Sequence, residues 1–193
     1  MNSNVTKLKT GRSVHQVRVT LLHCDPPIWR CLLVDTDMPL KQFHDALQIS
    51  MGWQDCHLHQ FIAGDVRYGI PDADLDPKMK SEAGVKLKVL LPKAGAEVIY
   101  EYDFGDAWEH ELLLEEILPW PDEALLPRCV AGERACPPED CGGPPGYADL
   151  LAGLNDPAHP EPEAMREWLG DDFDPDAFDV SAVNFRLGRI FVR

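Results

Sequence analysis

Long hydrophobic runs are missing from this sequence of 193 residues. Nowhere do about eighteen apolar residues follow one another, which is the minimum for a transmembrane helix. Residues 1–9 are polar and lack the apolar stretch of a secretion signal. We therefore expect a protein without membrane contact that resides in the cytoplasm.

Basic side chains are also scarce, since 18 Lys and Arg stand against 33 Asp and Glu and give a net charge of -15. Residues 122–180 hold 15 of the acidic residues and only three Arg. Such a field repels phosphate backbones and attracts basic surfaces. Direct nucleic-acid binding is therefore disfavoured, and we expect the partner to be a protein.

The signatures of common enzymes are absent too. The sequence has no phosphate-binding loop, dinucleotide fingerprint or nucleophile elbow. Asp172, Asp174 and Asp176 resemble the start of a calcium loop, but Ala177 replaces the glycine that such a loop requires. No reaction follows from these motifs.

Periodic patterns nevertheless predict a fold. Residues 14–22 alternate as a half-buried strand, and residues 28–34 form a second strand, paired antiparallel with the first. Asp37 can cap the start of a following helix, whose apolar positions share one face, and Gly52 can end it. Further strands are expected at residues 57–63 and 85–91, the second being the clearest alternation in the chain.

A hairpin is expected over residues 98–117, and short helices at residues 147–154 and 161–169. The sequence thus predicts one α+β domain over residues 1–193, with a mixed or antiparallel sheet that starts β-β-α, flanking helices and a Pro/Gly/Cys-rich loop. Residues 1–12 are expected to be a flexible tail. Residues 119–193 are expected to be an acidic loop-and-helix part packed on the sheet.

The hairpin is the most informative stretch because its register decides which side chains meet. A two-residue turn at Gly105-Asp106 would place four side chains on one face: Glu101, Asp103, Trp108 and His110. Two carboxylates beside an imidazole can bind a metal or act as acid and base. The catalytic candidates are therefore Glu101, Asp103 and His110.

A three-residue loop would reverse the relative faces. His110 would then lie with Tyr100 and Tyr102, and the carboxylates would form a solvated face. The predicted ligand or partner surface comprises five residues of the hairpin: Tyr102, Asp103, Asp106, Trp108 and His110.

Two further groups could bind a metal, and zinc is the expected ion. Cys129, Cys136 and Cys141 lie in a Pro/Gly-rich loop with wide spacings, so a fourth ligand such as His110, His159 or a carboxylate would be needed. His57 and His59 would point the same way from a strand. The alternatives are reduced, partly buried cysteines and histidines with ordinary hydrogen bonds. The remaining cysteines, Cys24, Cys31 and Cys56, are expected in the core.

Several motifs in one order resemble the plasmid pRiA4b ORF-three-like family. They are Pro26 to Arg30, Gly52-Trp53 followed by His57 to Phe61, Tyr102 to His110, Cys136 to Gly143 with Gly146-Tyr147, and Trp168-Leu169-Gly170 with Phe173 and Phe178. The resemblance covers nearly the whole chain. It implies an α+β fold carried by plasmids, transposons and chromosomes, and it implies no settled activity.

Two functions follow for testing. The first is a non-enzymatic binding or accessory module, in which the hairpin and the cysteine loop form one ligand or partner surface with a structural zinc. The second is a metal-dependent hydrolase or nuclease-like enzyme that uses Glu101, Asp103, His110 and the pair His57 and His59.

Overall fold

The structure is a computed structural model that describes residues 11–72, 74, 76–121, 125–155, 169 and 173–191. Its elements, in chain order, are β1 (Ser13–Leu21), β2 (Ile28–Asp35), α1 (Leu40–Met51), β3 (His59–Ala63), β4 (Val66–Gly69), β5 (Lys80–Ser81), α2 (Leu87–Leu90), β6 (Glu97–Tyr102), β7 (Trp108–Pro119), β8 (Arg128–Glu133), α3 (Gly143–Asn155) and α5 (Val180–Phe191). The expected tail, apart from residues 11 and 12, lies outside the described residues. So do His159 and all of the expected helix at residues 161–169 except its last residue.

The described strands form one sheet in the order β5-β4-β3-β6-β7-β1-β2-β8. Every neighbouring pair is antiparallel except β4 and β5. The predicted α+β fold with a mixed or antiparallel sheet that starts β-β-α is therefore confirmed. None of the helices within the described ranges has the length and apolar character needed to cross a membrane.

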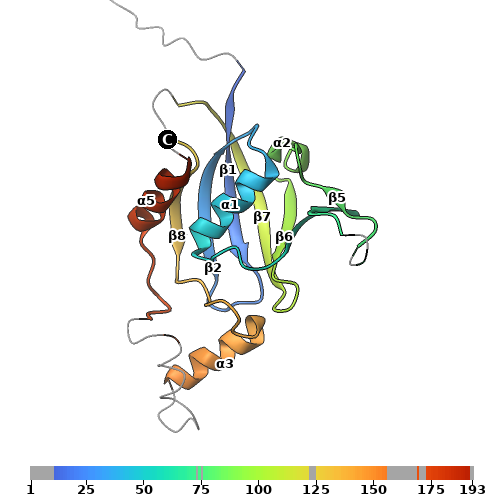
Figure 1. The fold of residues 1–193 in the computed structure, drawn as a ribbon. Coiled ribbons are helices and arrows are strands. Elements are labelled where there is room, and N and C mark those ends of the chain that lie inside the picture. Colours follow the sequence, from blue (N-terminus) through green and yellow to red (C-terminus); the bar gives the residue numbers. More distant parts are fainter. Residues whose placement is uncertain are drawn as a thin grey trace, which may run out of the picture.

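Helix α1 lies across one face of the sheet (Figure 1), as its apolar spacing predicts. It buries Leu40, Phe43 and Leu47 completely. Gly52 ends the helix with a left-handed φ of 104°, and its N–H donates to the carbonyl of Gln48 at 2.8 Å. The sequence pattern thus located both the buried face and the end of α1.

The predicted cap at Asp37 is wrong. Pro39 occupies the N-cap position of α1, and no side chain caps the helix there. The Asp37 carboxylate instead accepts hydrogen bonds from the Lys86 ammonium at 3.2 Å and pairs with the Lys88 ammonium at 2.7 Å. Asp37 therefore ties α1 to the start of α2.

The predicted strand at residues 85–91 is also wrong, because residues 87–90 form the short helix α2. Leu87 and Leu90 are both buried. They are three residues apart, which places them on the same side of one helical turn, whereas a strand would place them on opposite faces. The Leu87 N–H donates to the carbonyl of Met38 at 2.9 Å, which ties the turn to the approach to α1. A run this short could not be assigned from its periodicity.

The segment after β8 is folded back onto the hairpin loop. The N–H of Gly142 donates to Oδ2 of Asp106 at 3.0 Å. A Cβ atom on Gly143 would lie only 2.3 Å from the carbonyl oxygen of Asp106, so only glycine fits at this contact. Helix α3 begins at Gly143 and lies beyond the end of the sheet (Figure 1). The two regions singled out by the sequence therefore touch.

Candidate metal centre

The hairpin between β6 and β7 has a longer loop than a two-residue turn. Tyr100 pairs with His110, Glu101 with Glu109, and Tyr102 with Trp108. The loop starts at Asp103, whose φ of 57° is left-handed and whose Oδ1 accepts the Gly105 N–H at 2.9 Å. The two-residue turn and the shared face of Glu101 and His110 are therefore wrong. The alternative register is correct for His110, which lies with Tyr100 and Tyr102, but its solvated carboxylate face is wrong for Asp103, which is buried.

His110 is fully buried, and its imidazole is not placed to act as an acid or a base. Its Nδ1–H donates to the carbonyl of Tyr100 at 3.2 Å, and its ring meets that of Trp53 edge-on at 5.0 Å. Burial lowers the pKa of His110 to about 4. The side chain is therefore an uncharged core histidine at neutral pH, and Glu101 points elsewhere.

The three loop cysteines and His110 do not form a metal site. Among the described residues, none of the groups of three or more potential ligand atoms within 4.8 Å of one another contains a cysteine. The Cys129 thiol is buried on β8 and donates to the carbonyl of Ala131 at 3.3 Å. Burial raises the pKa of the Cys136 thiol well above its ordinary value, and the nearby Cys24 and Cys141 raise it further. These thiols are protonated at neutral pH and pack as small apolar groups.

All six cysteines are free. Of the three expected in the core, Cys31 is buried, Cys24 is half-buried, and Cys56 is exposed. The expectation is therefore correct for Cys31 and wrong for Cys56, which lies in the turn that leads into β3.

A different set of side chains meets where the hairpin loop contacts the cysteine loop. Nε2 of His57 lies 3.1 Å from Oδ1 of Asp140, 3.6 Å from Oδ2 of Asp103 and 3.9 Å from Oε2 of Glu139. We call these four residues the His57 cluster. Ligand atoms of His57, Asp103 and Asp140 all lie within 4.8 Å of one another.

The imidazole of the His57 cluster has an unused nitrogen. Nε2 is shielded from solvent and has no hydrogen-bond partner among the described residues, although three carboxylates approach it. A buried polar atom without a partner costs about 1–3 kcal/mol, so such atoms call for an explanation. Two atoms bound about 2.1 Å from one ion lie about 3.0–3.4 Å apart. The spacings from Nε2 to Asp140 and Asp103, 3.1 and 3.6 Å, are close to this range, whereas the 3.9 Å to Glu139 is longer.

Hydrogen bonds orient two of the carboxylates, and one oxygen of each still faces His57. Oδ1 of Asp103 accepts backbone N–H groups of its own loop, and the Asp103 N–H donates to the carbonyl of Leu58 at 2.9 Å. Oε1 of Glu139 accepts the Gln54 N–H at 2.9 Å, while the hydroxyl of Tyr102 lies 3.1 and 3.3 Å from the two oxygens. These contacts orient the carboxylates and leave Oδ2 of Asp103 and Oε2 of Glu139 toward His57.

Two of the carboxylates sit on left-handed backbone. Asp103 has a φ of 57° and Asp140 a φ of 55°, a region that aspartate adopts more readily than most residues because its side chain bonds to nearby backbone. This backbone directs both side chains into one small volume, since their ligand atoms lie within 4.8 Å of each other and of His57.

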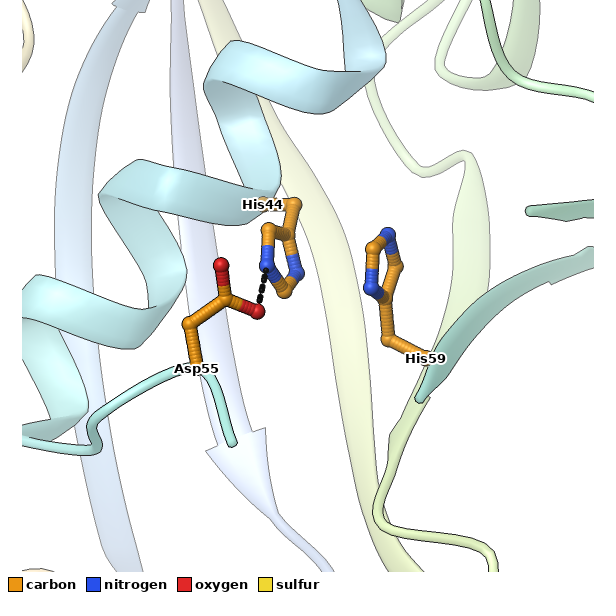
Figure 2. Close-up of side chains that lie close together, drawn as sticks. All are labelled: His44, Asp55 and His59. Atoms are coloured by element: carbon orange, nitrogen blue, oxygen red, sulfur yellow. Dashed lines mark hydrogen bonds and ion pairs between the residues drawn. The ribbon is translucent and has the colours of Figure 1, made fainter. Parts of the chain in front are cut away.

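A second group of potential ligands lies between α1 and β3 and consists of His44, Asp55 and His59 (Figure 2). Nε2 of His44 is 2.8 Å from Oδ1 of Asp55, and Nδ1 is 2.8 Å from the hydroxyl of Tyr100. Nε2 of His59 is 3.0 Å from Oε2 of the buried Glu82. We call these five residues the His44 network.

The protonation state of His44 follows from its partners. Burial, and then the neighbouring His59, lower the pKa of His44 to about 4, so the ring is neutral at pH 7. A carboxylate only accepts, so Nε2–H donates to Asp55 and Nδ1 accepts from the Tyr100 hydroxyl. The Gln48 amide donates to the oxygen of the same hydroxyl at 2.9 Å. Both nitrogens of His44 are therefore occupied.

The ring stacking argues against a metal in the His44 network. The rings of His44 and His59 are stacked, with centroids 3.6 Å apart and planes inclined by 15° (Figure 2). A metal binds an imidazole lone pair in the plane of the ring at about 2.0–2.1 Å. One ion cannot lie in two parallel planes at once, so this network is a hydrogen-bonded part of the core.

The predicted pairing of His57 with His59 is wrong for a local reason. Strand β3 begins only at His59, so His57 precedes the strand and does not follow its alternation. The sequence identified His57 and Asp103 and joined them only in the enzymatic alternative, together with Glu101, His110 and His59, which lie outside the cluster. It missed Glu139 and Asp140, whose only signal was their position beside Cys141. It also missed the buried His44 and Glu82 and the exposed Asp55, which lie around His59.

Comparisons with known proteins agree on one family. A family model described as plasmid pRiA4b ORF-3-like protein matches residues 13–182. The uncharacterised protein y4hQ of Sinorhizobium fredii is 36% identical over 174 residues, which are 89% of each chain. The crystal structure of MM3350 from Methanosarcina mazei Go1, titled a protein of unknown function, is 36% identical with a TM-score of 0.80 and covers 89% of this chain and 98% of its own.

Proposed function

This chain belongs to the plasmid pRiA4b ORF-3-like family, and we propose that it is a non-enzymatic binding or accessory module organised by a divalent cation in the His57 cluster. The cation would join three segments that are separate in the sequence: the approach to β3, the loop between β6 and β7, and the loop before α3. It would thereby hold in place the ligand or partner surface on the hairpin.

The observation that carries this proposal is the unused Nε2 of His57, shielded from solvent and faced by Asp103, Glu139 and Asp140. Without a cation, three carboxylates within 3.9 Å of one nitrogen also repel one another. A divalent ion would satisfy the nitrogen and offset the negative charge in the same step.

Zinc is the ion we propose first. One imidazole nitrogen and two or three carboxylate oxygens are donors that zinc accepts in a four-coordinate site. Hard ions such as magnesium and calcium prefer sites made only of oxygen. The thiols stay outside the site, so the proposed zinc differs from the cysteine-bound zinc expected from the sequence.

One observation favours a hydrolytic enzyme as a second candidate. The side chain of His57 is 29% exposed and that of Asp140 is 72% exposed, so water could reach an ion held between them. Catalytic zinc sites keep such an open position, whereas structural sites are closed. The catalytic residues would then be the ligands themselves, and Glu101 and His110 would take no part.

Metal analysis of the purified protein, with thermal melting before and after chelation, tests the proposal. We expect about one equivalent of zinc and a lower melting temperature after chelation. The variants Asp140→Asn and His57→Gln should lose the zinc, whereas Asp45→Asn, at a half-buried acidic position on α1 outside the His57 cluster, should keep it. Zinc in all variants, or in none of the proteins including the wild type after incubation with the metal, would contradict the proposal.

The two candidates differ in what chelation does. A structural ion should dissociate slowly, and its loss should lower the melting temperature. An exchangeable catalytic ion should leave with little change in the melting temperature, and adding zinc back should produce activity on a generic phosphodiester or ester.

A further inference from the structure

We propose that a pocket beside the His57 cluster binds a segment of a protein partner that carries a basic side chain next to an apolar one. The pocket has a volume of about 330 Å³ and is formed by β3, β4, the chain between β4 and β5, and the loop between β6 and β7. Its lining residues are Leu58, His59, Gln60, Arg67, Ile70, Asp72, Asp76, Met79 and Phe104. This proposal goes beyond the cation site and does not require it.

The mouth of the pocket gathers large apolar side chains that are exposed. Leu58 is 44%, Ile70 60% and Phe104 38% exposed, and they come from three separate segments. Single exposed apolar residues are ordinary, but several around one concave site mark a binding surface. The apolar part of the occupant would contact these three residues.

The polar part of the pocket is acidic. Asp72 and Asp76 line it together with a single guanidinium, that of Arg67, which already donates to Asp76 at 3.0 Å. Two further carboxylates are bonded to lining residues, since Glu82 bonds to His59 and Glu101 accepts from Gln60. Four carboxylates against one guanidinium favour a cationic occupant, and the net charge of -15 attracts one from a distance.

The pocket is built on fixed backbone. The N–H of Asp103 donates to the carbonyl of Leu58, which joins the hairpin loop to the segment that bears the apolar rim. A Cβ on Gly69 would lie 2.9 Å from the carbonyl oxygen of His59 and 3.0 Å from Sδ of Met79, so glycine lets Met79 pack against β4. A preformed pocket binds with little ordering cost.

A protein segment fits this site better than a free small amine. A ligand enclosed in about 330 Å³ would leave the outer surfaces of Leu58, Ile70 and Phe104 in water. A partner's chain would place one side chain in the pocket and cover the rim with its neighbours.

An NMR titration with short blocked peptides tests the proposal. The probe is acetyl-Leu-Arg-amide, added to ¹⁵N-labelled protein in the presence of a chelator. We expect the largest shifts at the backbone amides of Leu58, Gln60, Ile70 and Phe104. Three control probes should each bind at least about fivefold more weakly. Acetyl-Leu-Glu-amide lacks the positive charge, acetyl-Gly-Arg-amide lacks the apolar side chain, and isoamylamine lacks the peptide chain.

Paired variants locate the site. Ile70→Ser should weaken binding of acetyl-Leu-Arg-amide by about fivefold, while Val89→Ser, at a similarly exposed position on α2, should leave it unchanged. Equal binding of the acidic peptide, equal binding of isoamylamine, or no effect of Ile70→Ser would overturn the proposal. Because the chelator removes any cation, these outcomes are independent of whether the His57 cluster binds zinc.

Discussion

The His57 cluster and the His44 network contain the same types of side chain and draw on the same short segment, residues 55–59, but they differ in saturation. Both nitrogens of His44 are hydrogen-bonded and its ring is stacked on that of His59. Nε2 of His57 is unused although three carboxylates surround it. Proximity of histidine and carboxylate alone therefore does not identify a metal site. The unsatisfied atom and the directions of the lone pairs separate the two.

The largest expected effect concerns the His44 network, whose hydrogen-bonding atoms have partners. Replacing His44 with Ala removes a buried ring and leaves the hydroxyl of Tyr100 and the carboxylate of Asp55 without their partner. We expect the free energy of unfolding to fall by about 2–4 kcal/mol, measured by urea unfolding. Zinc binding to the folded variant should not change.

His23→Ala is the matched control, because His23 is an exposed histidine whose Nε2 lies 3.2 Å from the exposed carboxylate of Glu109. It should change the stability by less than about 0.5 kcal/mol. If His44→Ala were as mild as this control, or if it abolished zinc binding, the separation of the two regions would fail.

The next largest effect concerns the His57 cluster. Asp103→Asn keeps an oxygen that can accept the Gly105 N–H, and asparagine tolerates the left-handed backbone, so the loop should remain folded. It removes the charge that faces His57. Zinc affinity, measured by competition with a chelating dye, should fall about a hundredfold, while the stability of the metal-free protein changes little. A large loss of stability with unchanged affinity would reverse the roles of the two regions.

Acid should destabilise the His44 network. The pKa of His44 is lowered to about 4, whereas an imidazole in the unfolded chain has a pKa of about 6.5. The unfolded chain binds the proton first, so this contribution to stability is fully present above pH 6.5 and is lost as the pH falls toward 4.

We therefore expect unfolding of the wild type to become easier by about 1–2 kcal/mol from this residue between pH 6.5 and 4.5. Urea unfolding of His44→Ala over the same range should show a shallower slope. An identical slope would mean that His44 is not held neutral by its surroundings.

The smallest effect tests the support of the His57 cluster. The hydroxyl of Tyr102 accepts the Cys56 N–H at 3.0 Å and donates to Glu139. Tyr102→Phe keeps the packing of the ring and removes this link, so zinc affinity should fall about tenfold. Trp53 stacks on the same ring at 5.0 Å, and an unchanged melting temperature would show that this stacking survives. An unchanged affinity would mean that Glu139 takes no part in binding.

The sequence predicted the elements better than the contacts between them. The strands at β1 and β2, the buried face of α1 and its end at Gly52 follow from periods and from glycine geometry, which are local. The hairpin register was wrong because Asp103 turns the chain two residues before Gly105. That turn depends on a side-chain hydrogen bond and on the contact with Leu58, which no local pattern records.

The candidate site was half predicted for a similar reason. His57 and Asp103 were singled out by their types, but their meeting depends on β3 beginning at His59 and on the loop after β8 reaching the hairpin. Asp140 enters the cluster through that long-range contact and through the bonds from Trp53 to Pro137 and from Gln54 to Glu139. Such a site becomes visible only when segments more than thirty residues apart are brought together, as Asp106 and Gly142 are, with a separation of 36.

The most direct test of the central claim is anomalous diffraction at the zinc absorption edge from crystals of the zinc-loaded protein. The account predicts a single strong peak about 2.0–2.2 Å from Nε2 of His57 and from carboxylate oxygens of Asp103 and Asp140. A peak between His44 and His59, a peak at the cysteines, or no peak in the His57 cluster would contradict it.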